Sequence, residues 1–575
     1  MLRRIFSYMK EYKKYAWLAL ICIGVEVVLE IMVPKLMADL IDIGVTNSDV
    51  PYIINKGIQM AVCAVAALIL GVGSARFSAL AGQGLGANIR KAEYEKLQSY
   101  SFSNIDHFSV SSLVTRLTSD VTNIQNAVST GMRPFGRSLV MLIFATTLAF
   151  QINSTLALVF LVALPVLAVL LIIIIINVGP RYGRMQGAVD LVNRCIEENL
   201  TAVRVVKSYV RGDYEIEKFG HVNDNLKNES EKAFGIAVLN MPAMQFVMYS
   251  TILGILLIGG RLINSGQMMI GQLTSFLSYV LLILNSLMMM SNVFLLMTRS
   301  LASAERIMKV IDEPIDITDE NAKDIEVKKG EIEFNHVWFK YNETAKEYVL
   351  SDVSFHINAG QTVGIIGQTG SSKTTLIQLI PRLYDASKGE IKIDGINVKE
   401  YPVRHLRDAI SVVLQKNTLF SGSLIDNLRW GDENATLDEI KEACSIACVD
   451  EFIDRLPGGL DAEMGQEGVN VSGGQKQRIC IARAILKKPK VLILDDSTSA
   501  VDTATEGKIR NALAKKLPDM TKIIIAQRIS SVCHADQIII MDGGRVDAIG
   551  THESLLRTNK IYQEIYESQK EGADL

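Results

Sequence analysis

The sequence has no excess of basic residues, and this absence limits the partners that it can bind. Its 575 residues include 59 Lys and Arg against 62 Asp and Glu, a formal net charge of −3 at pH 7. Domains that bind nucleic acid carry a basic surface, because they must neutralise phosphates. The charge balance therefore gives no indication of a DNA or RNA partner, and we expect none.

Cysteines are also few. There are seven, an odd number scattered along a long chain, so they do not form the disulfide framework of a small secreted domain. Cys444 and Cys448 are four residues apart on a predicted helix, with no histidine or second cysteine pair nearby. We expect them to be buried thiols of a hydrophobic core rather than metal ligands.

Charged side chains are missing from three long stretches in the first half of the chain. The 43 residues from Ser138 to Pro180 contain no Asp, Glu, Lys or Arg, and roughly 20 apolar residues are enough to cross a bilayer. A polar break at residues 151–155 divides this stretch, which predicts two spans joined by a tight external turn. The full prediction is six membrane spans, near residues 15–37, near 52–84, two within 138–180, and one each in 233–260 and 262–298.

The distribution of Lys and Arg predicts how these spans are oriented. Five basic residues lie within residues 1–14, six in the loop 85–137 and nine in the loop 181–232, whereas the third external loop has Arg261 alone. Both termini and both long loops are therefore predicted on the cytoplasmic side of the cell membrane. Helical periodicity continues from the spans into the two long loops, which predicts helices that project into the cytoplasm and dock there.

Charged residues fall inside the first two predicted spans. Glu26 and Glu30 are one helical turn apart in the first span, and Arg76 is in the second. Charges within a membrane are costly and usually face a cavity or each other. Two interpretations stay open. One is a cation-attracting surface of a translocation cavity; the other is structural, with Glu26 or Glu30 paired with Arg76, or Lys35 extending outward to the membrane surface.

The composition changes after Arg299. An acidic linker follows a helical tail, and from there to Leu575 short β-branched strands alternate with helical stretches, a pattern typical of an α/β domain. The predicted organisation is an α-helical six-span transmembrane domain over residues 1–298, a linker over 299–328 and an α/β domain over 329–575.

A strand, a loop of small residues and a helix follow one another near residue 370. The strand at 363–366 leads into Gly367-Gln-Thr-Gly-Ser-Ser-Lys-Thr374, the arrangement of a phosphate-binding P-loop. Backbone N–H groups and the helix N-terminus attract phosphate anions. We expect Lys373 to reach the β and γ phosphates of ATP and the Thr374 hydroxyl to bind Mg²⁺. Ser372 stands where the motif has its second glycine, so its Cβ can crowd the loop.

Two further motifs belong with this loop. The apolar strand at 491–494 ends in Asp495, which places a carboxylate beside the predicted Mg²⁺ site, and Val471-Ser-Gly-Gly-Gln475 opens a helix. Together with the P-loop and the six spans, these motifs resemble an ATP-binding-cassette (ABC) exporter half-transporter of the bacterial multidrug type. The resemblance covers essentially the whole chain and implies that the α/β domain is a P-loop nucleotide-binding domain.

The resemblance also implies roles for individual residues. Tyr341 resembles the aromatic residue that stacks on adenine, Gln415 the glutamine near Mg²⁺, and residues 499–502 the D-loop. Ser472, Gly473, Gly474 and Gln475 resemble the signature that caps the γ-phosphate of ATP held by the opposite subunit. The implied ATP ligands in the chain's own half-site are Tyr341, Gly367, Gln368, Thr369, Gly370, Ser371, Ser372, Lys373, Thr374 and Thr375, and the implied Mg²⁺ ligands are Thr374, Gln415 and Asp495.

Two positions of the implied catalytic centre depart from the family pattern. Asp496 stands where efficiently hydrolysing members have Glu, and Gln527 stands where they have the switch-loop His. Asp is one methylene shorter than the Glu that orients the attacking water, and Gln cannot become a cation. We expect a site, with Asp496, Gln527 and Gln415 as its catalytic residues, that binds ATP and hydrolyses it slowly.

The intact signature and the altered catalytic centre together predict a partner. Because each composite site takes its P-loop from one subunit and its signature from the other, a second, different half-transporter is the preferred partner, with a homodimer as the alternative. The predicted function is ATP-driven export of small amphipathic molecules such as drugs. A homodimeric lipid or peptide exporter and an ATP-gated membrane regulator or channel are the other hypotheses.

Overall fold

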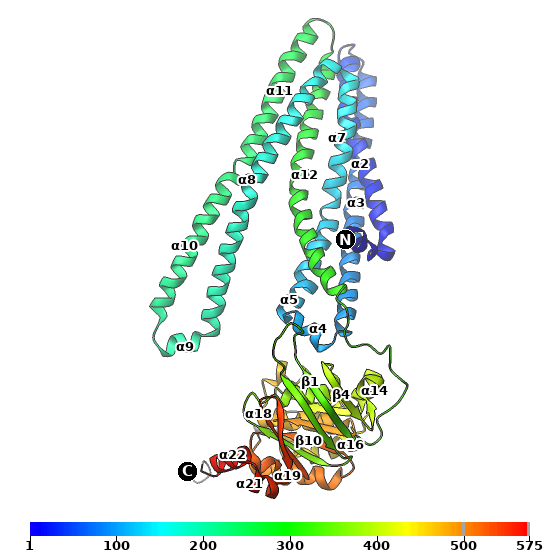
Figure 1. The fold of residues 1–575 in the computed structure, drawn as a ribbon. Coiled ribbons are helices and arrows are strands. Elements are labelled where there is room, and N and C mark those ends of the chain that lie inside the picture. The colour runs from blue at the N-terminus through cyan, green and yellow to red at the C-terminus, as the bar shows by residue number, and fades with distance from the viewer. Residues whose placement is uncertain (497–500, 572–575) are drawn as a thin grey trace. The chain divides into compact units, whose positions relative to one another are not determined.

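The computed structural model describes residues 1–496 and 501–571 and divides the chain into two compact units (Figure 1). The first unit, here the helical unit, comprises Met1–Gln98 and Val110–Asp312. The second, here the cassette unit, comprises Ser99–Ser109 and Glu313–Leu575. The short segment Ser99–Ser109 therefore belongs with residues that follow it by more than 200 positions.

The helical unit consists of long helices joined by short turns. Its helices are α1 (Leu2–Ser7), α2 (Lys13–Asp39), α3 (Val50–Gln98), α5 (Val110–Thr115), α6 (Val121–Ser129), α7 (Met132–Ile152), α8 (Ser154–Thr201), α9 (Val203–Ser208), α10 (Gly212–Ala237), α11 (Asn240–Asn264) and α12 (Ile270–Ile311).

Five helical segments among the described residues are long and apolar enough to cross a membrane. They are Lys10–Val45, Val50–Gln98, Val110–Ile152, Gly212–Asn264 and Ile270–Met290. The remaining predicted span falls in α8, a helix of 48 residues, part of whose side chains the structure does not describe. The chain is thus a multi-pass helical protein with five to six candidate spans.

The predicted break near residue 153 is confirmed and has a local cause. Asn153 adopts extended backbone between α7 and α8, and its side chain accepts a hydrogen bond from the Leu156 backbone N–H at 3.0 Å. This N-cap satisfies one of the free N–H groups that every helix start leaves. The Asn153 side chain therefore marks the start of α8.

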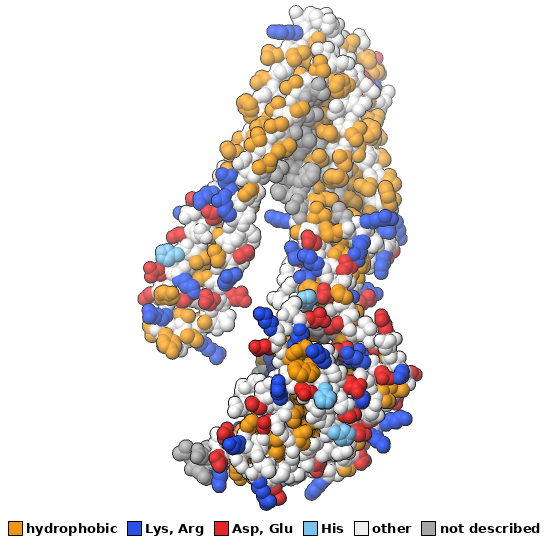
Figure 2. Space-filling model, in the orientation of Figure 1, with side chains coloured by type: hydrophobic (Ala, Val, Ile, Leu, Met, Phe, Trp, Pro, Cys, Tyr) orange, Lys and Arg blue, Asp and Glu red, His pale blue; other side chains and the backbone are white. Residues whose placement is uncertain are grey.

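The helices continue well beyond the apolar stretches, as predicted. α3 runs for 49 residues and α8 for 48, and α10 packs along α8. Figure 2 shows hydrophobic side chains over one end of these helices and charged side chains gathered on the end formed by α8, α9 and α10. At that polar end Val205, Tyr209 and Val210 are exposed apolar or aromatic residues.

A buried carboxylate ties the polar end of α12 to the segment before α6. Asp120 is 2% exposed, and it accepts hydrogen bonds from Ser303 Oγ at 2.8 Å and from Arg306 Nε at 2.8 Å. A second Arg306 nitrogen, Nη2, also donates to Asp120. The paired bonds of a guanidinium to one carboxylate give this junction a fixed geometry.

The cassette unit contains two main sheets. The larger has the strand order β12-β11-β3-β10-β9-β6, parallel except for β12, and the smaller has the order β2-β1-β4-β5. The strands are β1 (Ile332–Phe339), β2 (Leu350–Ile357), β3 (Thr362–Gly367), β4 (Lys388–Ile393), β5 (Ile396–Asn397), β6 (Ile410–Val413), β7 (Gly422–Ser423), β8 (Glu463–Met464), β9 (Val491–Asp495), β10 (Thr521–Ile525), β11 (Gln537–Asp542) and β12 (Arg545–Gly550).

Helices cover the sheets of this unit and enclose its cores. They are α13 (Lys373–Leu379), α14 (Val403–Asp408), α15 (Leu424–Arg429), α16 (Leu437–Ile446), α17 (Asp450–Ile453), α18 (Gly473–Leu486), α19 (Thr503–Lys516), α20 (Ile529–Val532), α21 (His552–Thr558) and α22 (Lys560–Glu571). Cys444 and Cys448 are buried in one of these cores, as expected for structural thiols. Central parallel strands such as β9 are buried at every position, because helices pack on both faces.

The segment Ser99–Ser109 forms the short helix α4 (Phe102–His107) on the cassette unit. Asp106 accepts a hydrogen bond from the Tyr384 hydroxyl at 2.6 Å, and Asn104 donates to the Pro314 carbonyl at 2.8 Å. The Phe102 ring lies 6.1 Å from the Tyr384 ring. The prediction that a long polar loop docks elsewhere in the protein is therefore confirmed for the first loop.

Candidate nucleotide-binding site

The P-loop lies where a central parallel strand meets a helix. β3 ends at Gly367 and α13 begins at Lys373, so the loop between them sits at the carboxyl edge of the sheet, where ligands of open α/β sheets bind. Lys373 Nζ donates to the Gly367 and Gln368 carbonyls at 2.8 and 2.9 Å. The amine is thus held over the loop, and burial lowers the pKa of Lys373.

A cavity of about 320 Å³ opens beside this loop and gathers most of the predicted site residues. It is lined by Thr369, Gly370, Ser371, Ser372, Lys373, Thr374, Thr375, Gln415, Asp495, Asp496, Ile525 and Gln527. The sequence separates the first and last of these residues by more than 150 positions. They meet because β3, β10 and β9 are adjacent parallel strands whose carboxyl ends share one edge.

The expected Mg²⁺ ligands form one cluster. The Thr374 hydroxyl donates to Asp495 at 3.0 Å, and Gln415 lines the same cavity. Burial raises the pKa of Asp495, so a cation beside it would be favourable. Hydroxyl, amide and carboxylate oxygens are the ligands that Mg²⁺ prefers, and the donor set therefore fits this metal.

Asp496 and Gln527 are in direct contact. Gln527 Nε2 donates to Asp496 Oδ2 at 2.9 Å, and burial raises the pKa of Asp496 while this bond opposes the rise. Gln569 in α22, which the sequence-based predictions did not include, hydrogen-bonds to the backbone at and just after Gln527. It donates to the Gln527 carbonyl at 2.7 Å and accepts from the Ile529 N–H at 2.8 Å. The end of the chain thereby fixes the backbone that presents Gln527.

Ser372 keeps the backbone conformation for which the P-loop motif uses glycine. Its φ and ψ are 69° and 23°, the left-handed region, which costs a residue with a Cβ roughly 1–2 kcal/mol. The loop therefore keeps the glycine-type backbone conformation although the residue is Ser, and the Ser372 backbone is strained.

Replacing Ser372 with Gly should leave ATP affinity unchanged, as measured by titration with a fluorescent trinitrophenyl ATP analogue. The free energy of unfolding should change by less than about 1 kcal/mol, because relief of the strain is offset by the greater entropy of Gly in the unfolded chain. Ser372→Ala, which keeps the Cβ, is the matched control. A tenfold gain in affinity for the Gly variant alone would show that the Cβ crowds the phosphates.

Tyr341 lies at the side of the P-loop helix. Its hydroxyl is 2.9 Å from the Thr375 hydroxyl and 3.2 Å from Gln378 Oε1, and its ring meets the Tyr384 ring edge-on at 5.2 Å. The ring is about half exposed and can receive a planar base by stacking.

The residues predicted as the signature lie apart from this cavity. Ser472 caps α18: its hydroxyl accepts from the Gln475 N–H at 3.3 Å, and the Gln475 side chain accepts from the Ser472 N–H at 2.9 Å. Gly473 and Gly474 form the first turn of that helix. None of the four is among the described residues that line the P-loop cavity. Of the predicted D-loop, residues 499 and 500 lie outside the described residues.

Comparison with known proteins decides the family. Residues 16–287 match the family model of the ABC transporter transmembrane region, and residues 350–499 match that of the ABC transporter. The chain is 37% identical over 575 residues, 100% of both chains, to the uncharacterized ABC transporter ATP-binding protein YfiB of Bacillus subtilis. This chain is a member of the ABC transporter family. The resemblance inferred from its motifs is confirmed.

Other relatives of this ABC transporter carry more specific names. This chain is 32% identical to a putative multidrug export ATP-binding/permease protein, YgaD of Bacillus subtilis, over 84% of this chain and 83% of that protein. It is also 32% identical to the ATP-dependent lipid A-core flippase of Pseudomonas putida, over 98% and 95%. The solved structure of a bacterial Atm1-family ABC exporter with ATP bound superposes with a TM-score of 0.83 over 98% of both chains, at 22% identity.

Family membership establishes the general activity. The protein is an ABC exporter, in which a membrane domain is fused to a nucleotide-binding domain and transport is driven by ATP hydrolysis with Mg²⁺. Exporters of this kind act as dimers in a membrane. The residues of the P-loop cavity have the chemistry that this activity needs: an amine and backbone N–H groups for phosphates and oxygen ligands for the metal.

Proposed function

We propose that this ABC exporter is one half of a heterodimeric pump that moves small amphipathic molecules such as drugs out of the cell, and that its own P-loop forms the slower of two ATP sites. The single observation that supports the slow site is the contact between Asp496 and Gln527. A short carboxylate held by a neutral amide lacks the reach of Glu and the charge of a protonated His.

The position of the signature supports the need for a partner. Ser472–Gln475 caps α18 and does not line the chain's own P-loop cavity, so these residues are available to another chain's ATP. An intact signature beside an altered catalytic pair suits a heterodimer, because this chain would complete its partner's site while contributing a weak one itself. The membrane domain, linker and nucleotide domain would extend over residues 1–298, 299–328 and 329–575, with both termini in the cytoplasm.

The proposal gives each site residue a role. Lys373 and the loop from Gly367 to Thr375 would hold the phosphates, Tyr341 would stack on adenine, and Thr374, Gln415 and Asp495 would bind Mg²⁺. Asp496 would orient the attacking water with Gln527 beside the γ-phosphate. When bound, the metal would neutralise developing phosphate charge.

The isolated chain should hydrolyse ATP slowly. We expect turnover below about 0.1 s⁻¹, two orders below the median enzyme turnover of about 10 s⁻¹, although the chain binds the trinitrophenyl ATP analogue. The assay is phosphate release by the purified full-length chain in micelles, with Lys373→Ala as the control for contaminating ATPases. Turnover near 1 s⁻¹ or faster that Lys373→Ala abolishes would contradict the heterodimer and favour a homodimeric lipid or peptide exporter.

A further inference from the structure

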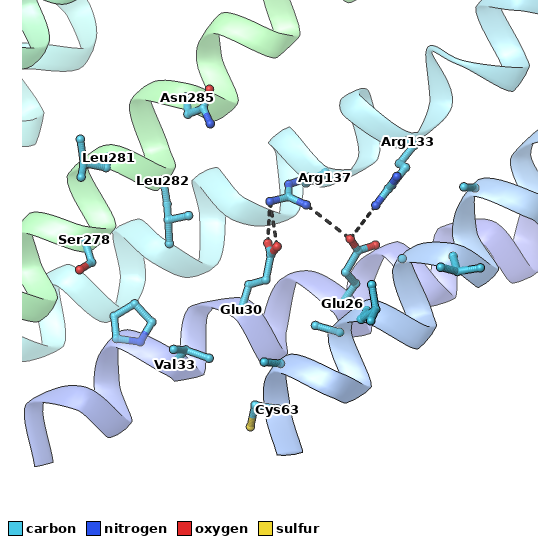
Figure 3. Close-up of a pocket in the computed structure, with 17 residues that line it drawn as sticks. Glu26, Glu30, Val33, Cys63, Arg133, Arg137, Ser278, Leu281, Leu282 and Asn285 are labelled. Atoms are coloured by element: carbon cyan, nitrogen blue, oxygen red, sulfur yellow. Dashed lines mark hydrogen bonds and ion pairs between the residues drawn. The ribbon is translucent and has the colours of Figure 1, made fainter. Parts of the chain in front are cut away.

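A cavity of about 960 Å³ lies among the membrane helices of the helical unit (Figure 3). Its wall combines two kinds of surface. One part carries the four charged residues Glu26 and Glu30 of α2 and Arg133 and Arg137 of α7. The other part is mainly apolar and comes chiefly from α3 and α12, with Ser278 and Asn285 of α12 as its polar members.

The charged residues form one network. Arg133 Nη2 lies 2.9 Å and Arg137 Nη1 3.4 Å from Glu26 Oε1, and Arg137 Nη2 lies 2.8 Å from Glu30 Oε2. Among the described residues Arg76 makes no ion pair, so the open interpretation that paired Arg76 with Glu26 or Glu30 is wrong. Arg133 and Arg137 stand just before the uncharged run, in the loop predicted to be cytoplasmic, and no local pattern marks them as the partners.

Arg133 is the most exposed member of the network. The side-chain exposures are 38% for Arg133 and 5% for its partner Glu26, whereas Arg137 and Glu30 are similar at 25% and 28%. Both carboxylate oxygens of Glu26 have partners: the two arginines bind Oε1, and Ser74 Oγ donates a hydrogen bond to Oε2 at 3.3 Å. A guanidinium has five N–H donors, and the ion pairs with Glu26 and Glu30 use only some of the N–H groups of Arg133 and Arg137. The remaining N–H groups can donate hydrogen bonds to a ligand, whereas both oxygens of Glu26 already have partners.

Small side chains line the α3 side of the cavity, here called the apolar track. Ala64, Ala67, Gly71 and Ala75 repeat at helical spacing on the cavity side, next to Leu68 and Val72. Small side chains leave width for a chain of methylene groups. At Gly71 the space is needed by the network itself, because a Cβ there would lie 3.0 Å from Glu26 Oε1 and 3.1 Å from Arg133 Nη2.

We propose that this cavity binds an anionic amphiphile, a molecule with a carboxylate or phosphate head group on an apolar tail. The head group accepts hydrogen bonds from Arg133 and Arg137, and the tail lies along the small-residue side of α3. This inference rests on the proposed export of amphipathic molecules and narrows their class. It also replaces the cation-attracting surface as the interpretation of Glu26, whose two oxygens are taken by Arg133, Arg137 and Ser74. Glu30 pairs with Arg137 and holds that guanidinium in place.

Binding by head group is measured on the purified full-length chain in micelles of an uncharged maltoside detergent, without nucleotide. The probes are dansyl-undecanoate and its uncharged methyl ester, which share one tail and one fluorophore. We expect the carboxylate to bind about tenfold more tightly than the ester, since a hydrogen bond to a charged group contributes to affinity on this scale. Arg133→Gln should remove this preference and leave ester binding unchanged, and Arg261→Gln, in the last turn of α11, should change neither.

The outcomes separate the possible ligands. Competition by dodecyl phosphate at low concentration with no competition by inorganic phosphate supports an amphiphile; equal competition by both would overturn the role of the apolar track. Equal affinity for carboxylate and ester, or tighter binding of dodecylamine than of either, would overturn the anionic class. Retained ester binding shows that Arg133→Gln is folded.

Gly71→Ala gives a second test through the geometry of the network. The added methyl group would displace Glu26 or Arg133, so the preference for the carboxylate probe should fall several-fold, whereas Gly57→Ala on the same helix, where a Cβ meets no atom within 4 Å, should leave it unchanged. An unaltered preference in Gly71→Ala counts against the network. Because nucleotide is absent, a fast or slow ATPase rate of the isolated chain has no bearing on this result, and the two proposals fail separately.

Discussion

Exchanging Asp496 for Glu and Gln527 for His in one chain should raise its rate of ATP hydrolysis by about 10²-fold. The added methylene moves the carboxylate by roughly 1 Å toward the attacking water, and a misplacement of that size costs on the order of 10²-fold in rate. The imidazole, unlike the amide now bonded to Asp496 at 2.9 Å, can carry a positive charge beside the γ-phosphate. Phosphate release at saturating MgATP measures the effect.

The control for this gain is a chain with His at 527 and Asn at 496, which has the new imidazole but no carboxylate. We expect it to remain as slow as the unaltered chain. Adding Lys373→Ala to the faster variant should abolish its activity. If the double variant binds the ATP analogue but its rate does not rise, Asp496 and Gln527 are not what limits hydrolysis, and the heterodimer loses its main support.

Removing the Asp120 carboxylate should lower the free energy of unfolding of the helical unit by about 2–3 kcal/mol. Ser303 is buried and loses its acceptor, whereas Arg306 is 47% exposed and is partly solvated when unpaired. In Asp120→Ala, Arg306 and Ser303 both lose the acceptor that now receives their hydrogen bonds. The measurement is the midpoint of thermal unfolding of the full chain in micelles, followed by intrinsic fluorescence, and we expect a drop of several degrees.

Ser303→Ala is the matched comparison, because it removes one hydrogen bond and keeps the ion pair. Its expected cost is about 1 kcal/mol. Equal midpoints for Asp120→Ala and the unaltered chain would contradict a structural role for this junction.

The sequence predicted those features that depend on neighbours along the chain. The break at Asn153 and the strand-loop-helix around Lys373 could be found because a cap or a phosphate loop is built within a few residues. The meeting of Lys373 with Asp495 could also be inferred, since both follow buried parallel strands whose carboxyl ends share an edge.

Contacts that depend on how distant elements pack could not be predicted. Glu26 pairs with Arg133 and Arg137 rather than with Arg76, because the relative rotation of α2, α3 and α7 decides which side chains meet. Gln569 contacts Gln527 through the placement of α22, which no local pattern specifies. In both cases the residue type was visible in the sequence and its partner was not.

The docking of α4 on the cassette unit has a consequence for synthesis of the chain. Tyr384 follows Asp106, its hydrogen-bond partner, by 278 residues. At a translation rate of about 5–20 residues per second, the ribosome needs roughly 14–56 s to pass from one to the other. During that time Phe102 and its neighbours have no surface to bury against, so the loop that carries them stays exposed on the nascent chain until the cassette unit is made.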